Sequence, residues 1–222
     1  MEIRIEHLSK SFGKKQVLRD ITFSAVGGKC IGILGVNGCG KSTLLSLLAG
    51  VQRADGGAFY FESSDLFQDE KRRQHLVGYV PQGTPLIEEL NGWDNLLLWY
   101  DRETLKKELD GGVLKVLGVD AFLKTTVSKM SGGMKKRLSI GCAMAQKPPV
   151  LLLDEPTAAL DLSVKKDILR YLSQYKKSRG LLVMTSHDPI ELEMCDECYI
   201  MREGVLHPFA YDGNIHTLME KL

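Results

Sequence analysis

The stretch Gly35-Val36-Asn37-Gly38-Cys39-Gly40-Lys41-Ser42-Thr43 decides the fold, because it fits the phosphate-loop pattern G-x-x-x-x-G-K-[ST]. Residues 30–34 before it form a continuous apolar run, which is typical of a strand buried on both faces. Residues 41–50 after it carry leucines at helical spacing. Strand, glycine-rich loop and helix are the context that the pattern requires, so we expect an α/β protein that binds a nucleotide.

Each residue type in this loop has a chemical role. Glycines let backbone N–H groups surround phosphate oxygens, because no Cβ stands in the way. Lys41 supplies a cation for the β and γ phosphates, and the Ser42 hydroxyl can ligate Mg²⁺. A glycine turn that fits by chance is the alternative, but it does not explain the strand and helix on either side. The candidate binding residues are Gly35, Asn37, Gly38, Cys39, Gly40, Lys41, Ser42 and Thr43.

A second candidate site follows another apolar run. Residues 150–153 predict a buried strand that delivers Asp154 and Glu155 at its carboxyl end, where α/β folds bind ligands. Asp154 can hold Mg²⁺, and Glu155 can polarise the water that attacks a γ phosphate. The alternative is a solvated acidic pair before the turn at Pro156.

The composition narrows the class of protein. The 222 residues include 29 Lys+Arg and 28 Asp+Glu, so the net charge of +1 offers no argument for a nucleic-acid surface. Five cysteines in a chain of this size predict free thiols, and Cys195 and Cys198 have metal-like spacing without a second pair. The apolar runs are far shorter than the ~20 residues of a membrane span. Residues 1–7 show no secretory signal, so we expect a cytoplasmic protein.

The remaining pattern predicts the organisation of the chain. Alternation over residues 2–7 and 17–26 predicts a small antiparallel sheet, and residues 77–80 predict another strand. From about residue 91 to 146 the pattern turns helical, which predicts a helical subdomain over about residues 83–146. We therefore expect one domain over residues 1–222: a RecA-like P-loop NTPase core with an N-terminal antiparallel β subdomain and an inserted helical subdomain.

Taken together, the motifs resemble those of a known family. The phosphate loop and the acidic pair are joined by four further segments, in the order in which the nucleotide-binding domains of ABC (ATP-binding cassette) proteins carry them. These segments are Tyr79-Val80-Pro81-Gln82, similar to the Q-loop; Met130-Ser131-Gly132-Gly133-Met134, similar to the signature; Ala159-Leu160-Asp161, similar to the D-loop; and Ser186-His187-Asp188, similar to the switch histidine.

The resemblance implies roles for residues that mean little alone. It implies that ATP and Mg²⁺ bind, that His187 contacts the γ phosphate, and that Gln82 links Mg²⁺ and the attacking water to the helical subdomain. Phe12 lies where the family carries an aromatic that stacks on adenine, although it could be a core residue instead. The resemblance thus gives Glu155, His187, Lys41 and Gln82 as catalytic residues and Ser42, Gln82 and Asp154 as metal ligands.

The resemblance also implies a dimer. In the family, the signature segment reaches across a head-to-tail dimer to the partner's phosphate loop, so Ser131, Gly132 and Gly133 would complete the partner's site, and Asp161 would lie at the interface. Ser131 and Asp161 could also cap the helices that follow. Met130 and Met134 depart from the usual leucine and glutamine of the signature. The other motifs are intact, so we expect an active ATPase.

Two functions remain open at this stage. The first is an ATPase subunit, held at the cytoplasmic face of a membrane, that drives separate membrane permease subunits. Residues 83–100, with exposed Trp93, Trp99 and Tyr100, would be the docking groove, although each could be a core residue. The short helical subdomain favours an export-type system. The second is a soluble ABC ATPase switch in a cofactor-assembly, nucleic-acid or ribosome complex.

Overall fold

A single ten-stranded sheet organises the part of the chain that the computed structural model describes, residues 1–214, 217 and 221. The strands are β1 Glu2–Phe12, β2 Lys15–Val26, β3 Cys30–Leu34, β4 Gly56–Phe61, β5 Ser64–Asp65, β6 Val77–Val80, β7 Val150–Asp154, β8 Leu181–Thr185, β9 Glu197–Arg202 and β10 Val205–Phe209.

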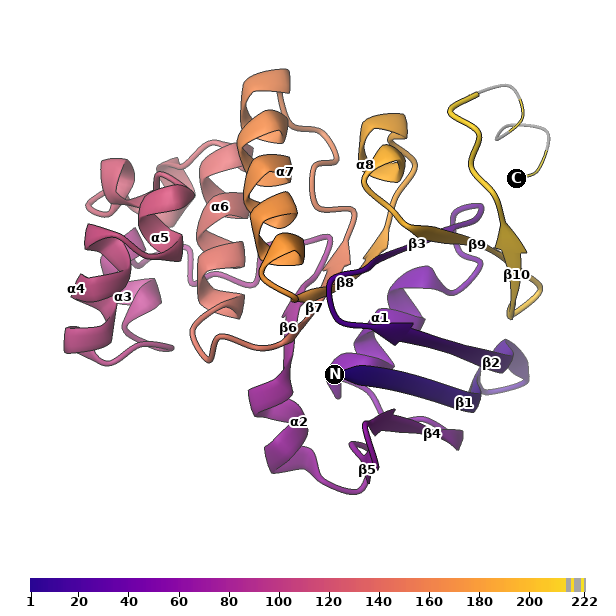
Figure 1. Ribbon diagram of the computed structural model, residues 1–222. Helices are drawn as coiled ribbons and strands as arrows, with labels where there is room; N and C mark the ends of the chain where they lie inside the picture. Colours follow the sequence, from indigo (N-terminus) through magenta and orange to yellow (C-terminus); the bar gives the residue numbers. More distant parts are fainter. Residues whose placement is uncertain (215–216, 218–220, 222) are drawn as a thin grey trace.

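The helices pack on this sheet and beside it (Figure 1). They are α1 Lys41–Ala49, α2 Glu70–Leu76, α3 Gly92–Leu96, α4 Arg102–Asp110, α5 Val113–Val116, α6 Gly132–Ala143, α7 Leu162–Lys177 and α8 Pro189–Glu193, with 3₁₀ turns η1 Val119–Phe122 and η2 Val127–Lys129.

The strand order is β5-β4-β1-β2-β10-β9-β3-β8-β7-β6. The last five strands, from β9 to β6, are parallel, and every residue of β3, β7 and β8 is buried. Burial on both faces is the reason that these strands are continuous apolar runs. The parallel strands have their carboxyl ends at one edge, so the loops that follow β3, β6, β7 and β8 meet there.

Two hydrophobic cores lie on opposite faces of the parallel strands. Alternate residues such as Leu152 and Val183 belong to the core that includes the α1 leucines. Their neighbours Leu151 and Leu182 belong to the core that includes residues of α6 and α7. The period of two in each strand therefore divides the apolar side chains between the two faces.

The N-terminal strands form the predicted antiparallel part of the sheet. β1 pairs with both β2 and β4, with register shifts after Ile5. Gly13, at φ 59°, forms the turn between β1 and β2. β1 is longer than the alternating pattern predicts, because the shifts let it continue to Phe12, at the edge of the candidate site.

The segment between β6 and β7 is helical, as predicted, and forms the left side of Figure 1 with α3–α6. The boundaries of this segment as a subdomain remain a prediction. Of the two alternatives for Tyr100, the structure supports the core: the residue is 4% exposed and donates its hydroxyl to the Gly141 carbonyl at 2.7 Å. Trp93 packs partly into the same core, while Leu98 and Trp99 are more than half exposed.

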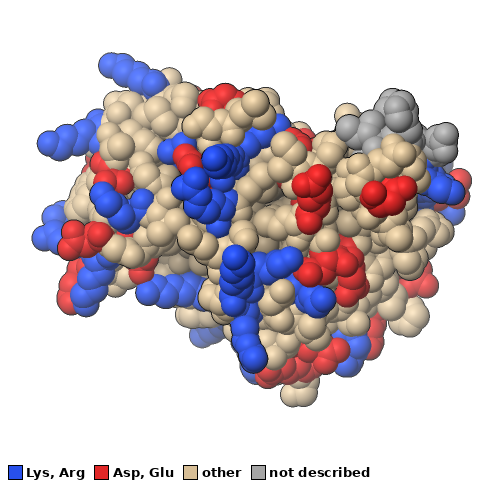
Figure 2. Space-filling model, turned by 45° about the horizontal axis from the view of Figure 1, so that its top comes forward, with Lys and Arg blue, Asp and Glu red and all other residues tan. Residues whose placement is uncertain are grey.

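The face shown in Figure 2 carries charges of both signs. Lys and Arg side chains are more frequent over the helical side on the left, and Asp and Glu side chains are more frequent on the right. Such a mixed face lacks the single-sign field that draws a polyanion to a surface.

Candidate functional site

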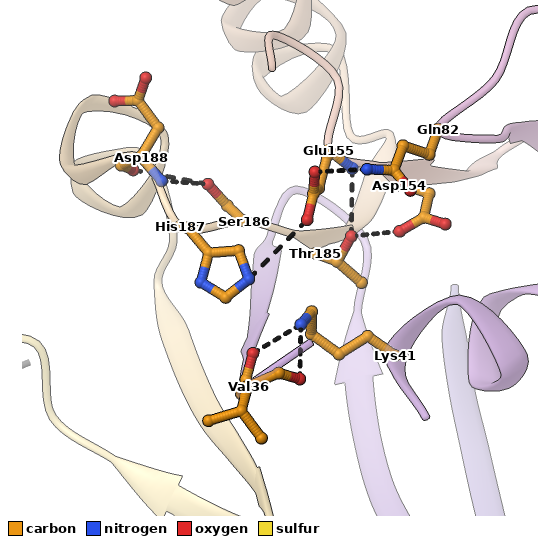
Figure 3. Close-up of polar contacts among 10 residues, drawn as sticks. Val36, Lys41, Gln82, Asp154, Glu155, Thr185, Ser186, His187 and Asp188 are labelled. Carbon is orange, nitrogen blue, oxygen red and sulfur yellow. Dashed lines mark hydrogen bonds and ion pairs between the residues drawn. The ribbon is translucent and has the colours of Figure 1, made fainter. Parts of the chain in front are cut away.

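The candidate site lies at the carboxyl edge of the parallel strands. The glycine-rich loop follows β3, Gln82 follows β6, Glu155 follows β7 and His187 follows β8. Figure 3 shows the side chains of Gln82, Glu155 and His187 converging from three separate segments. The sheet topology therefore brings together residues that lie up to 146 positions apart, from Lys41 to His187.

The loop after β3 requires its glycines for backbone reasons. Gly35, Gly38 and Gly40 have φ of 151°, 78° and 117°, values that side-chain-bearing residues rarely adopt. A Cβ at Gly35 would lie 2.7 Å from the Met201 carbonyl oxygen, so no larger residue fits there. The loop ends at Gly40, which begins α1 without any side-chain cap. The uncapped N–H groups of α1 are therefore free to bind an anion.

Lys41 adds a buried cation to this loop. The residue is 6% exposed, and its Nζ donates to the carbonyls of Gly35 at 2.5 Å and Val36 at 3.3 Å. Both partners are neutral carbonyls, and no described carboxylate forms an ion pair with Lys41. A buried ammonium with neutral partners is a strong anion-binding group, because a bound anion supplies the missing charge.

Asp154 and Glu155 are held by one residue that the sequence analysis did not single out. Thr185, fully buried at the end of β8, donates its hydroxyl to Asp154 Oδ1 at 2.6 Å. The same hydroxyl oxygen accepts the Glu155 N–H at 3.1 Å, and the Thr185 carbonyl accepts it at 3.2 Å. A threonine at the end of an apolar strand carries no signal in the sequence, since its role arises from the pairing of β7 with β8.

Glu155 occupies an unusual backbone conformation and has two side-chain neighbours. Its φ is 46°, in the left-handed region, which is uncommon for a residue with a side chain. Its Oε2 accepts from Gln82 Nε2 at 2.9 Å, and its Oε1 lies 3.7 Å from His187 Nε2. The carboxylate is thus oriented from two sides.

The surroundings of His187 favour its neutral form. Partial burial and the nearby Lys41 ammonium lower its pKa, and the Glu155 carboxylate opposes the shift without reversing it. A neutral ring can donate one hydrogen bond and accept another.

The residues predicted to hold Mg²⁺ fit that ion. Asp154, Ser42 and Gln82 offer a carboxylate, a hydroxyl and an amide oxygen, which are the oxygen donors that Mg²⁺ prefers. Gln82 uses its nitrogen on Glu155, which leaves its amide oxygen for a metal. Ser42 is exposed in the first turn of α1, and Asp154 is 3% exposed. Three protein ligands leave room for phosphate oxygens and water around the ion.

A hollow of about 670 Å³ connects the glycine-rich loop with Gln82, Glu155 and His187. Phe12 lies at its edge and is 49% exposed, so it is available for stacking rather than part of the core of the first sheet. The hollow is lined by Phe12, Lys15, Val17, Asn37, Gly38, Gly40, Lys41, Ser42, Thr43, Gln82, Glu155 and His187.

The signature and D-loop residues do not line this hollow. Ser131 caps α6 by accepting the Met134 N–H at 3.3 Å, and Asp161 caps α7 by accepting the Val164 N–H at 3.0 Å. Gly133 has a packing role, because a Cβ there would lie 2.9 Å from the Val164 side chain. Met130 is buried and Met134 is partly buried in the same core, which accounts for apolar residues at the two departures from the signature.

The cysteines show no sign of a metal centre. All five are free thiols, and no group of three or more His, Cys, Asp or Glu side chains among the described residues could hold a metal ion. Cys39, in the phosphate loop, is partly buried and packs against the core that contains α1.

Comparison with known proteins settles the family. A family model described as ABC transporter matches residues 18–158. The chain is an ATP-binding cassette of the ABC transporter family. Within the described residues, no helix of this cassette has the length and apolar character needed to span a membrane.

Curated relatives cover nearly all of the cassette. The sulfate/thiosulfate import ATP-binding protein CysA of Bacillus cereus is 32% identical over 97% of this chain and 68% of its own. The spermidine/putrescine import ATP-binding protein PotA of Bacteroides thetaiotaomicron is 36% identical over 97% of this chain and 48% of its own. The linearmycin resistance ATP-binding protein LnrL of Bacillus subtilis is 32% identical over 91% of this chain and 67% of its own. The chain thus spans about half to two thirds of the length of these proteins.

Solved structures agree with the fold. A nucleotide-free ATP-binding cassette from an ABC transporter matches with a TM-score of 0.86 at 24% identity, over 99% of this chain and 96% of the other. An ATP-binding cassette in its ADP conformation matches with a TM-score of 0.82 at 26% identity, over 99% of this chain and 95% of the other. The predicted α/β fold is therefore confirmed. The family model and the curated ATP-binding relatives show that the cassette binds ATP and is an ATPase.

Proposed function

We propose that this cassette is the ATP-hydrolysing subunit of an ABC transporter, that it works as a head-to-tail dimer, and that it is coupled to membrane subunits on separate chains. The observation that carries the proposal is the position of Glu155. Its carboxylate is held between Gln82 and His187 at the edge of a hollow whose other side is the Lys41 loop. This arrangement suits in-line attack on a phosphoryl group by a positioned water.

Glu155 is the general base of the proposed reaction. Its carboxylate accepts a proton from the attacking water, and the Gln82 amide keeps one oxygen in a fixed direction. Lys41 and the N–H groups of the glycine loop stabilise the negative charge of the phosphates. His187, whose pKa is lowered by burial and by Lys41, would donate a hydrogen bond to the γ phosphate. Asp154, Ser42 and Gln82 would hold Mg²⁺, which when bound would neutralise charge on the phosphate oxygens.

A dimer is proposed because one chain presents two separate halves of a site. The signature residues Ser131 and Gly132 are exposed at the start of α6 but do not line the hollow that contains Lys41. Leu162, just after Asp161, is 76% exposed. An exposed glycine at a helix N-terminus and an exposed leucine suit a partner surface that carries both phosphate and apolar groups.

The surface that contacts the membrane subunits is proposed to be residues 83–100, which follow the Q-loop and include α3. Ile87, Leu98 and Trp99 are each 45% or more exposed there. Exposed apolar side chains in one short segment suit a surface that receives a partner helix. Docking would hold the cassette at the cytoplasmic face of the membrane.

The export direction expected from the helical subdomain is not supported. The named relatives CysA and PotA are import proteins, and we do not extend the export prediction to this chain. A soluble ATPase switch is the second candidate, because ATP-driven closing needs no membrane partner. Trapping the closed state in cells separates these two.

The experiment uses the Glu155→Gln variant, trapped with ATP and Mg²⁺ in its native cells. Membranes are solubilised in mild detergent, and the proteins that purify with the cassette are identified. A multi-span membrane protein, absent when Lys41 is also changed to Ala, is the expected result. Recovery of soluble partners alone, with the cassette absent from membranes, would overturn the transporter proposal in favour of the soluble switch.

A further inference from the structure

A buried lysine outside the predicted site contacts the Q-loop, residues 79–82. Lys136 lies in the second turn of α6 and is 4% exposed. Its Nζ donates to the carbonyl oxygens of Pro81 at 3.0 Å and Gln82 at 3.2 Å. These bonds join residues 54 and 55 positions apart in the sequence, so they link the signature helix to the loop after β6.

Lys136 is buried, and its Nζ is held by two backbone carbonyl oxygens. Burial lowers its pKa overall, and the nearby carboxyl groups of Asp154, Glu191 and Glu155 oppose that shift. Hydrogen bonds from a charged donor are stronger than neutral ones, and a buried ammonium that lost them would be left unsatisfied.

Gln82 is consequently held at both ends. Its backbone carbonyl accepts from Lys136, and its side-chain Nε2 donates to Glu155 Oε2 at 2.9 Å. One turn before Lys136, Ser131 caps the same helix and lies in the signature segment. A continuous set of contacts therefore runs from α6, through Lys136 and Gln82, to the Glu155 carboxylate.

We propose that Lys136 is a positioning residue that fixes the Q-loop backbone to α6, so that the Gln82 amide stays on Glu155 and a displacement of α6 changes the orientation of the general base. The inference rests on the proposed function, in which Glu155 is the base. Lys136 acts through Gln82 and contacts neither the nucleotide nor the water.

A purely structural role for Lys136 predicts different results. A lysine that only stabilises α6 would lower the stability of the cassette, and its effect on turnover would not depend on Gln82. A positioning role predicts a loss in kcat at nearly constant KM for ATP, and an effect that disappears when Gln82 cannot reach Glu155. Double-mutant cycles measure this dependence directly.

The experiment measures phosphate release by the purified full-length cassette over a range of ATP concentrations with Mg²⁺. Lys136→Met should lower kcat by about 10-fold to 100-fold, the usual effect of losing a supporting contact in a site. KM for ATP should stay within about threefold. Lys136→Arg, which keeps a cation and its donors, should restore most of the loss. If the methionine variant does not fold, Lys136→Gln replaces it in every comparison.

Lys135→Met is the matched control. Lys135 precedes Lys136 on the same helix, but it forms a surface ion pair with Glu88 at 3.2 Å, and such pairs contribute little. Its variant should keep the kcat of the wild type. In a Gln82→Ala background, Lys136→Met should change kcat by less than about twofold.

Three results would overturn the inference: equal kcat in the Lys136 and Lys135 variants, a raised KM at constant kcat, or the same loss in the Gln82→Ala background as in the wild type. The Glu155→Gln variant distinguishes a failure of the proposed function from a failure of this inference. A Glu155→Gln variant that turns over normally contradicts the base assignment, whereas a loss confined to Glu155→Gln, with normal Lys136→Met, contradicts only the inference.

Discussion

Replacing Thr185 by Val tests how the site holds its two carboxylates. Valine has nearly the same shape, so the buried position at the end of β8 remains filled. The change removes the hydroxyl that donates to Asp154 Oδ1 at 2.6 Å and accepts the Glu155 N–H at 3.1 Å. The Glu155 N–H keeps the Thr185 carbonyl at 3.2 Å, so the strained backbone at Glu155 stays anchored.

The magnitude follows from the bond to Asp154. A buried hydrogen bond to a charged group contributes about 1.5–3 kcal/mol, and only the bond to the carboxylate is lost without replacement. At about 1.4 kcal/mol for each factor of ten, a loss near 2 kcal/mol corresponds to about 30-fold. We therefore expect the Mg²⁺ concentration for half-maximal ATP hydrolysis to rise about 10-fold to 30-fold.

The assay is phosphate release at saturating ATP over a Mg²⁺ titration. Thr185→Ser is the matched control, because it restores the hydroxyl and should return the Mg²⁺ requirement to within about threefold of the wild type. An unchanged Mg²⁺ requirement in the valine variant, at normal thermal stability, would refute the reasoning that Thr185 orients the metal-binding carboxylate.

Two further predictions concern packing and charge. Gly133→Ala should lower the free energy of unfolding in urea by about 1–3 kcal/mol, because the added Cβ would lie 2.9 Å from the Val164 side chain. Gly132→Ala is the control and should unfold like the wild type, because its Cβ would lie 3.7 Å from Leu160. Equal stabilities of the two variants would contradict the packing role of Gly133. Burial raises the pKa of Glu191 in the folded state. Above the unperturbed Glu pKa of about 4.3, the unfolded chain loses a proton that the folded state keeps, so the free energy of unfolding falls as pH rises. Glu191→Gln should lack this fall when melting temperatures are measured between pH 4.5 and pH 8. The same dependence of melting temperature on pH in the wild type and in Glu191→Gln would contradict this prediction.

Much of the fold could be predicted because the parallel strands are buried on both faces. The strands at residues 30–34 and 77–80 were predicted with the bounds that the structure has. The local sequence was sufficient there, because each of these strands is a short apolar segment that stands out from its neighbours. For Tyr100 the sequence left exposure and burial open, because its burial depends on α6, which packs against it from 41 positions away.

The site was predictable where motifs carry the chemistry and not where contacts between strands do. Lys41, Gln82, Glu155 and His187 come from segments with recognisable patterns, and the fold brings them to one hollow. Thr185 and Lys136 act through partners that only the sheet pairing and the packing of α6 reveal. The role of the signature residues stays a prediction, because their proposed ligand lies on a second cassette.

The most direct test of the central claim is ATP turnover by the purified cassette with and without the Glu155 carboxylate. The account predicts that Glu155→Gln lowers the rate of phosphate release by at least about 100-fold, as expected for loss of a general base, and that it still binds ATP. Near-normal phosphate release by Glu155→Gln would contradict the assignment of Glu155 and the mechanism built on it.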